Sequence, residues 1–175
     1  MRHGIVLAKS YEAKRFGVAK GDTLWQAKLK CPDIRFVPPD FELYCRLAAE
    51  VRAIYHSYTD RVESFGMDEC WLDVTGSEKI FAPDSRNESE AGLTIANEIR
   101  ERVKRETGLT VSVGVSFNKT FAKLGSDMKK PDAVTVIPRE NFKDIVWPLP
   151  VRDLLYVGSK TERKLTMYGI DTIGK

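Results

Sequence analysis

The residues best suited to chemistry are two adjacent carboxylates, Asp68 and Glu69, which stand between two short runs of strand-like composition. The surrounding segment reads Arg61-Val-Glu-Ser-Phe-Gly-Met-Asp-Glu-Cys-Trp-Leu-Asp-Val-Thr75. Mg²⁺ prefers oxygen ligands, and enzymes that transfer nucleotides hold it between one or two carboxylates and the substrate phosphates. An isolated Asp-Glu pair is more often an acidic turn, so the rest of the chain must decide between the two.

The composition sets the class of protein in which this pair lies. A chain of 175 residues with 42% hydrophobic content can bury one substantial core. Cys31, Cys45 and Cys70 are widely spaced and form no Cys-x-x-Cys motif, which argues against a disulfide framework or a zinc site. No apolar run has the length of a signal peptide or a membrane span. We therefore expect a soluble, cytoplasmic, globular protein that does not associate with membranes.

The charge is distributed unevenly along the chain, although the net charge is only +3. Residues 1–35 carry eight basic and three acidic side chains, residues 36–99 carry five and thirteen, and residues 100–135 carry eight and four. Carboxylates that hold metal ions, flanked by cations that neutralise phosphates, would give this distribution in an enzyme of nucleic acids. Solvated helix faces would give much of it as well.

The elements that must position the carboxylates follow from periodicity and capping residues. Asp68 and Glu69 lie near the turn of a predicted hairpin formed by residues 62–67 and 70–74. Residues 109–117 alternate between large apolar and small side chains, which predicts a strand whose small face leaves room for a packed helix or a substrate. We also predict strands over 4–8 and 133–137, helices over 10–16, 23–30, 40–55, 89–106, 118–128 and 139–147, and a helix-hairpin-helix over 151–170 joined at Val157-Gly158-Ser159. Ser10, Asp40 and Asn118 can cap helices, and Gly108 ends the helix over 89–106. The outer face of that helix offers the ion pairs Glu98/Arg102 and Glu101/Arg105.

Four of these segments, in this order, resemble the Y-family translesion DNA polymerases, the group that contains the bacterial DinB and UmuC/ImpB/MucB proteins. The first is Ser10-Tyr-Glu-Ala-Lys-Arg-Phe-Gly-Val18, and the second is Phe65-Gly-Met-Asp-Glu-Cys-Trp-Leu-Asp-Val-Thr75. The third is Val113-Gly-Val-Ser-Phe-Asn-Lys-Thr-Phe-Ala-Lys123 with Lys130-Pro131-Asp132, and the fourth is the helix-hairpin-helix. Together they span nearly the whole chain.

The resemblance implies an α+β, right-hand polymerase architecture. Residues 1–39 would form the fingers, residues 40–137 a ferredoxin-like palm with a mixed or antiparallel sheet and helices on one face, and residues 138–175 the start of a helical thumb. The implied activity is DNA-directed DNA synthesis across damage, in DNA repair and the SOS response. The implied partners are primer-template DNA and a deoxynucleoside triphosphate, with a sliding clamp bound beyond this C-terminus.

The resemblance also assigns roles to single residues. Asp68 and Glu69 match ligands of two Mg²⁺ ions, with Mn²⁺ as an alternative, and Glu69 lies nearest the primer 3′ hydroxyl. Tyr11, Lys14 and Lys130 match contacts to the triphosphate. The expected phosphate contacts to DNA lie at the hairpin turn, at Gly158, Ser159 and Lys160. The residues alone fit equally well an ordinary αα-hairpin that packs on itself.

Departures from the family pattern lead to further expectations. Position 14 is often arginine in the family, and family members usually have glycine at the positions of Ala133 and Tyr156. A few dozen residues that supply a first palm strand, a third metal-binding aspartate and an aromatic ribose gate have no counterpart before Arg2. We therefore expect a fragment of a polymerase that is inactive alone and that self-associates through exposed strand edges.

Two other functions fit parts of the pattern. A palm-type nucleotide cyclase would use the same carboxylates, but the segments resembling the fingers and the helix-hairpin-helix argue against it. A non-catalytic module that binds DNA or a protein partner would explain the lack of a third carboxylate. The retention of Asp68, Glu69, Tyr11 and Lys130 together favours the polymerase.

Overall fold

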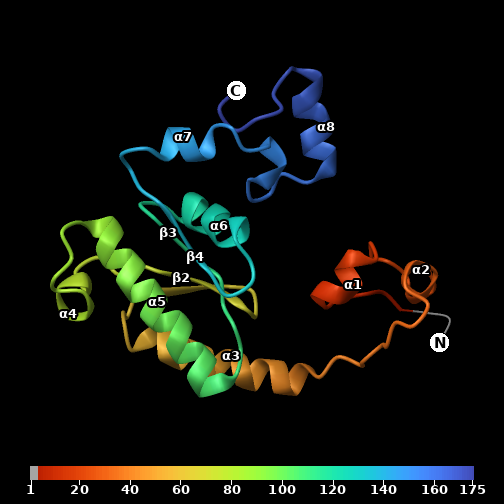
Figure 1. Cartoon of the computed structure of the whole chain (residues 1–175), viewed down its shortest axis with the longest axis horizontal. Coiled ribbons are helices and arrows are strands. Elements are labelled where there is room, and N and C mark those ends of the chain that lie inside the picture. Colours follow the sequence, from red (N-terminus) through yellow and green to blue (C-terminus); the bar gives the residue numbers. More distant parts are fainter. Residues whose placement is uncertain (1–3) are drawn as a thin grey trace. The chain divides into compact units, whose positions relative to one another are not determined.

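The computed structural model describes residues 4–175, which divide after Asp40 into two compact units (Figure 1). Residues 1–3, at the start of the predicted fingers segment, lie outside the described residues. None of the helices within residues 4–175 combines the length and apolarity needed to cross a bilayer. The expected α+β class is confirmed by the mixture of helices and small sheets.

The first unit contains two predicted helices, α1 (Tyr11–Arg15) and α2 (Leu24–Lys30). Ser10 Oγ accepts a hydrogen bond from the Ala13 amide at the start of α1, and Thr23 forms a reciprocal capping box with Gln26 at the start of α2. Val6, Val18 and Ala27 form the small core beneath these helices.

The predicted strand over residues 4–8 is wrong. Ile5 forms only an isolated bridge with Thr23, supported by backbone hydrogen bonds that Val6 exchanges with Asp22 and Gly21. The pairing ends there because α2 begins at Leu24, and the chain that would continue the ladder turns into a helix.

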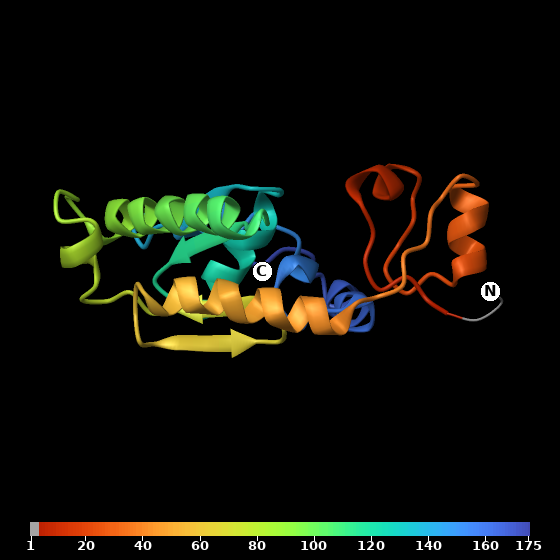
Figure 2. The same ribbon diagram turned by 90° about the horizontal axis from the view of Figure 1, so that it is seen from below.

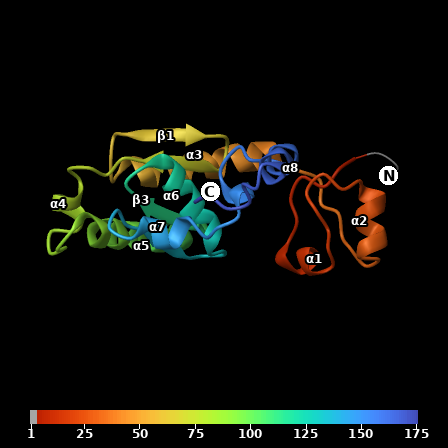
Figure 3. The same ribbon diagram turned by 90° about the horizontal axis from the view of Figure 1, so that it is seen from above.

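The second unit is built on two helices that cross each other, α3 (Phe41–His56) and α5 (Glu88–Thr107). Figure 2 and Figure 3 show α5 and the antiparallel hairpin of β1 (Val62–Phe65) and β2 (Glu69–Leu72) on opposite sides of this unit. The buried core joins both helices to the hairpin and to an unpredicted helical turn, α4 (Glu78–Phe81), through Ile54, Tyr58, Ala82, Ala91, Ile95, Ile99 and Val103, with Leu72 packed against them.

A parallel ladder forms the other half of this unit, with β3 (Val113–Ser116) paired to β4 (Val134–Ile137) through the crossover helix α6 (Lys119–Met128). Successive β3 residues face opposite sides: an added Cβ at Gly114 would meet the α6 backbone, whereas Val115 packs against Gly92 of α5. The small face predicted for this strand therefore receives a helix.

The sheet differs from the single palm sheet with helices on one face that the resemblance implies. Within residues 4–175, β1–β2 and β3–β4 form two separate two-stranded sheets, and helices cover both faces of β3–β4. Side chains join the two ladders: Trp71 Nε1 donates a hydrogen bond to the Lys119 carbonyl over 3.1 Å. The hairpin therefore reaches β3–β4 through α6.

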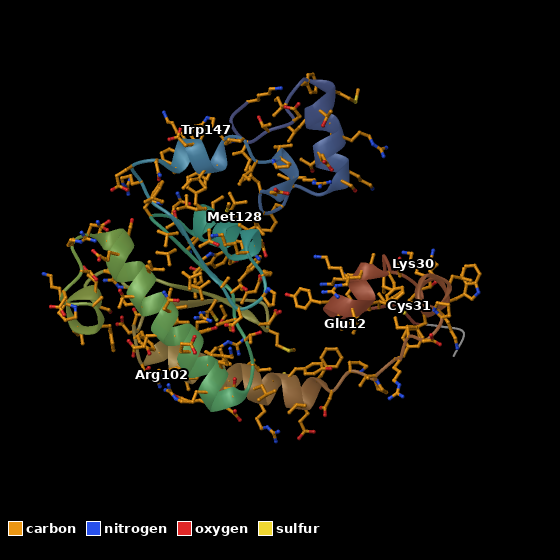
Figure 4. The ribbon with its side chains drawn as sticks, in the orientation of Figure 1. Glu12, Lys30, Cys31, Arg102, Met128 and Trp147 are labelled. Carbon is orange, nitrogen blue, oxygen red and sulfur yellow. The ribbon has the colours of Figure 1, made fainter. Side chains whose placement is uncertain are left out.

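Several predicted elements are shorter in the structure. The strand predicted over 109–117 is reduced to β3 because only four of its residues pair with β4. The helix predicted over 139–147 becomes α7 (Phe142–Val146), which ends beside Trp147, labelled in Figure 4. In the helix-hairpin-helix, the first helix is a single 3₁₀ turn (Val151–Asp153) before the second, α8 (Ser159–Met167), because the backbone becomes extended at Leu154.

Candidate active site

The two carboxylates lie at the tip of the β1–β2 hairpin, as predicted. Phe65 pairs with Glu69, so that Glu69 is the first residue of β2 and Asp68 belongs to the three-residue loop. The Asp68 side chain is exposed and that of Glu69 is half-buried. Because side chains alternate along a strand, Glu69 shares one face of the hairpin with Phe65 and Trp71. The ring centroids of Phe65 and Trp71 are 4.8 Å apart, and the two rings form an apolar surface beside the Glu69 carboxylate.

An arginine that the sequence did not single out holds the loop. Arg52 projects from α3, and its Nη2 donates hydrogen bonds to the carbonyl oxygens of Gly66 at 3.2 Å and Met67 at 2.8 Å. Charge-assisted bonds to two consecutive carbonyls restrict the backbone just before Asp68. The position of the first carboxylate is therefore set from the core helix α3.

Two lysines one turn apart on α6 reach the hairpin from its other side. Lys119 pairs with Glu63, and its Nζ lies 5.5 Å from the centre of the Trp71 ring. Lys123 Nζ lies 2.8 Å from Glu69 Oε1 and 2.8 Å from Asp127 Oδ2. The Asn118 side chain caps α6 by accepting a hydrogen bond from the Phe121 amide, which fixes where the helix begins and so which residues face the hairpin.

The ion pairs continue from Asp127 to Lys130, the predicted triphosphate contact, whose Nζ lies 2.7 Å from Asp127 Oδ1. The order Glu69, Lys123, Asp127, Lys130 thus alternates in sign through three contacts of 2.7–2.8 Å. The structure therefore brings two predicted residues, Glu69 and Lys130, into one network whose inner members the sequence did not identify. The spacing of Lys119 and Lys123 shows from the sequence that they share a helix face, but not which carboxylates they meet.

Hydrogen bonds stabilise the charged forms of Lys123 and Asp127, the inner pair of this network, although both side chains are partly buried. Burial lowers the pKa of Lys123, but hydrogen bonds to Asp127 and Glu69 outweigh this effect and leave the pKa above its ordinary value. Burial likewise raises the pKa of Asp127, and hydrogen bonds from Lys123 and Lys130 reverse the shift, so that the pKa lies below its ordinary value. Both groups are therefore ionised at neutral pH.

The loop that carries Lys130 is tied to α5. Asp132, at a positive φ of 54°, pairs with Arg100 at 2.7 Å and with Lys104 at 2.8 Å. Hydrogen bonds from Lys104 and Arg100 hold the pKa of Asp132 below its ordinary value. The ion pairs expected within α5, Glu98 with Arg102 and Glu101 with Arg105, are wrong. Their partners lie elsewhere: the Tyr58 hydroxyl donates to Glu98, and Arg102, labelled in Figure 4, pairs with Glu106.

The other predicted contacts lie on separate elements. Tyr11 and Lys14 are exposed on α1 of the first unit, and their i, i+3 spacing places them on the same side of that helix. Gly158 is the N-cap residue of α8, with Ser159 and Lys160 exposed in its first turn. Tyr156, where the family usually has glycine, adopts the left-handed φ of 69° that glycine would favour.

The donor set at the hairpin suits a hard cation. Asp68 and Glu69 offer carboxylate oxygens, and an ammonium already lies against Glu69 Oε1. No group of three or more potential ligands for one metal ion occurs among residues 4–175. Asp73 is engaged elsewhere, because it pairs with Arg61 and accepts a hydrogen bond from the Thr75 amide. A Mg²⁺ ion held by two carboxylates and by substrate phosphates fits this set.

Known proteins share both this fold and these segments. The chain is 58% identical over 173 residues to the DNA polymerase IV of Acetivibrio thermocellus and 41% identical over 174 residues to DNA polymerase IV 1 of Bacillus subtilis. Each alignment covers 99% of this chain, and it covers 41% of the first relative and 40% of the second. The chain therefore spans about two fifths of the length of the curated relatives that it matches.

The structural comparison agrees with this result. The crystal structure of DinB from Sulfolobus solfataricus matches 97% of this chain and 48% of its own with a TM-score of 0.87 at 28% identity. An insertion ternary complex of Dbh DNA polymerase matches 93% of this chain and 45% of its own with a TM-score of 0.84 at 28% identity. The family model of the IMS helix-hairpin-helix motif matches residues 139–170. The model of the impB/mucB/samB family matches residues 1–127, and the chain belongs to this family.

Proposed function

We propose that this chain carries part of the active site of a translesion DNA polymerase of the cytoplasm, which acts on primer-template DNA and a deoxynucleoside triphosphate. The observation that carries the proposal is the ionic network at the hairpin tip, which joins Glu69 to Lys130 through Lys123 and Asp127. This network supports the proposal because it would keep a cation-binding carboxylate of β2 close to a phosphate-binding lysine that follows α6. The similarity to enzymes named DNA polymerase IV supports the same reaction.

Each predicted residue has a role in this reaction. Asp68 and Glu69 would hold Mg²⁺, and Glu69 would face the primer 3′ hydroxyl. Bound Mg²⁺ would supply charge neutralisation for the transferred phosphoryl group and a lower pKa for the attacking hydroxyl. Lys130, with Tyr11 and Lys14 of the first unit, would bind the triphosphate and align it for in-line attack.

The remaining segments have roles in binding DNA and partners. The proposed subdomains are fingers at 1–39, palm at 40–137 and the start of the thumb at 138–175. The Gly158 amide donates a hydrogen bond to the Tyr156 carbonyl over 3.2 Å, whereas the amides of Ser159 and Lys160 precede the hydrogen-bond ladder of α8. The turn at Gly158, Ser159 and Lys160 would bind a DNA phosphate through these two amides without reading sequence. The whole protein would bind a sliding clamp. The unpaired edges of the β1–β2 and β3–β4 ladders would support self-association of this chain. Size-exclusion chromatography over a range of concentrations measures that self-association.

The test is to exchange segments with the Acetivibrio thermocellus relative. Replacing the matched region of that DNA polymerase IV with this chain should give a chimera that extends a primer in Mg²⁺. Asp68→Asn and Glu69→Gln should each reduce extension at least about a hundredfold, because each removes a carboxylate that acts on the transition state. Glu63→Gln, on the same hairpin face but paired with Lys119, is the matched control. A folded chimera that extends equally well with E69Q would refute the proposal.

One observation favours a second function, a non-catalytic DNA-binding module. Within residues 4–175, the hairpin carboxylates are not joined by a third potential ligand. For the same reason, we expect little or no primer extension by the 175-residue chain alone. Binding to duplex DNA that weakens as salt increases, together with a folded chimera that extends no primer, would favour the module over the enzyme.

A further inference from the structure

Lys123 is placed to act on the carboxylate site although it belongs to none of the predicted contacts. Its side chain is only 15% exposed, and its ammonium lies 2.8 Å from one oxygen of Glu69 and 2.8 Å from one oxygen of Asp127. A primary ammonium is a compact point charge that is strongly hydrated in water. Here the carboxylates of Glu69 and Asp127 replace part of that hydration, so the ammonium is in direct contact with Glu69.

The two partners of Lys123 differ in what else they can bind. Asp127 has a second cation, Lys130, on its other oxygen. Glu69 is 38% exposed, and Lys123 is the only cation that an ion pair places on it within the described residues. The ion pair with Asp127 therefore keeps Lys123 in place when Glu69 binds another cation.

We propose that Lys123 is the resident counter-ion of Glu69 and competes with a divalent cation for this carboxylate. This inference rests on the proposed function. In the absence of metal, Lys123 holds the Glu69 side chain toward α6 and offsets its charge. When Glu69 binds a divalent cation, the Lys123 ammonium remains paired with Asp127 at the edge of the site. Lys123 is a positioning residue in this scheme, and it sets the metal concentration that the site requires.

The sign of the expected effect follows from charge. A positive group in contact with a ligand of a divalent cation opposes binding of that cation, so removing it should strengthen binding. Solvent screens the half-exposed site, so we expect a change of about threefold to tenfold in the dissociation constant. Lys123→Met keeps the length and apolar stem of the side chain. It leaves Asp127 paired with Lys130 and Glu69 open to water, so the chain should fold.

The experiment measures Mn²⁺ binding to the 175-residue chain. Electron paramagnetic resonance reports free Mn²⁺ directly and needs no catalytic activity. The matched control is Lys119→Met, which removes a lysine one helical turn away that pairs with Glu63 rather than Glu69. We expect K123M to bind Mn²⁺ about threefold to tenfold more tightly than the unchanged chain, and K119M to bind with unchanged affinity. Circular dichroism melts verify that each variant is folded.

Double variants locate the bound ion. In the K123M background, Asp68→Asn should abolish the gain, whereas Asp127→Asn should leave it. A gain that survives D68N but is lost with D127N would mean that Mn²⁺ merely replaces the ammonium between Glu69 and Asp127, and would overturn the inference. Equal or weaker binding by K123M, or the same gain in K119M, would also overturn it.

The outcome for Glu69→Gln separates this inference from the proposed function. If E69Q weakens Mn²⁺ binding but K123M does not strengthen it, the metal site stands and the role of Lys123 fails. If E69Q binds as the unchanged chain does, Mn²⁺ binds away from Glu69 and the role of Lys123 fails, while primer extension by the E69Q chimera decides the proposed function. If neither the unchanged chain nor K123M binds Mn²⁺, the competition is refuted, and primer extension by the chimera still decides the proposed function.

Discussion

Gly114 is the position where a single methyl group should cause the largest structural damage near the site. A Cβ added there would overlap the Ala122 carbonyl oxygen and lie 2.5 Å from the Ser126 amide nitrogen. Both obstacles are backbone atoms of α6, which cannot rotate away as a side chain can. Gly114→Ala should therefore push α6 away from β3 and move Lys119 and Lys123 relative to the hairpin.

The size of the effect can be estimated from the nature of the contact. Overpacking a closed core costs about 1–3 kcal/mol, and a clash with helix backbone belongs at the upper end, at about 3 kcal/mol. For a chain of this length, that free energy lowers the melting temperature by about 6–12 °C. G114A should also lose the effect of K123M on Mn²⁺ binding, because that effect depends on the approach of α6 to Glu69.

Two other glycines provide the controls in urea and thermal denaturation. Gly125 lies within α6, where an added Cβ would be 3.3 Å from the Gly114 Cα. The helix propensity of alanine, about 1 kcal/mol better than glycine, offsets this mild crowding, so Gly125→Ala should change stability by less than about 1 kcal/mol. Gly158→Ala, with no neighbour within 4 Å, should change stability by at most about 1 kcal/mol. If G114A unfolds at the same urea concentration as G125A, the backbone contact does not set the position of α6.

Three further predictions concern the loops and the core. Arg52→Met should lower the free energy of unfolding by about 2–4 kcal/mol in urea denaturation and weaken Mn²⁺ binding, because it removes two charge-assisted hydrogen bonds to the loop before the carboxylates. Asp132 has a lowered pKa, so its pairs stabilise the fold above its ordinary pKa and are lost as pH falls through the folded value. The difference in urea midpoint between the unchanged chain and Asp132→Asn should therefore shrink as the pH falls below about 4, and a constant difference would contradict this. Burial raises the pKa of Tyr55 to about 12, so Tyr55→Phe should remove the last phase of tyrosinate absorbance in an alkaline titration. The raised pKa also means that stability from Tyr55 is present below about pH 10 and lost as pH rises through about 12.

The sequence predicts well those features that neighbours along the chain determine. The sequence predicts caps at Ser10 and Asn118, and each accepts a hydrogen bond from the backbone amide three residues later. Thr23, predicted only as the start of a helix, caps α2 in the same way. Gly108 ends α5 in the left-handed conformation expected of a C-terminal glycine. The hairpin also forms at the predicted place with Asp68 in the loop, but its arms are 62–65 and 69–72 rather than 62–67 and 70–74, so Glu69 belongs to β2. These features need only local backbone and side-chain chemistry.

The features that the sequence does not predict depend on distant partners. The strand over 109–117 is shortened because its length is set by β4, whose pairing no local pattern encodes. Of the ion pairs predicted within α5, the one between Glu98 and Arg102 is lost partly to a tertiary contact, because Glu98 accepts a hydrogen bond from Tyr58. Arg102 and Arg105 instead pair with Glu106 of the same helix, and Glu101 pairs with Arg100. The sequence does not identify Arg52 as a site residue for the same reason, because the carbonyl groups that accept its hydrogen bonds belong to the hairpin loop and not to α3.

The candidate site shows how the two kinds of information combine. The motif identifies Asp68 and Glu69 from the sequence, but the charge environment of Glu69 comes from Lys123, 54 residues later, on a helix that packs against a different ladder. That helix lies close enough only because Gly114 has no side chain. The hairpin and the β3–β4 ladder share no backbone pairing within residues 4–175, so the reach of α6 sets the distance between the carboxylates and Lys130. A substitution on the small face of β3 should therefore alter cation binding at a hairpin that it does not touch.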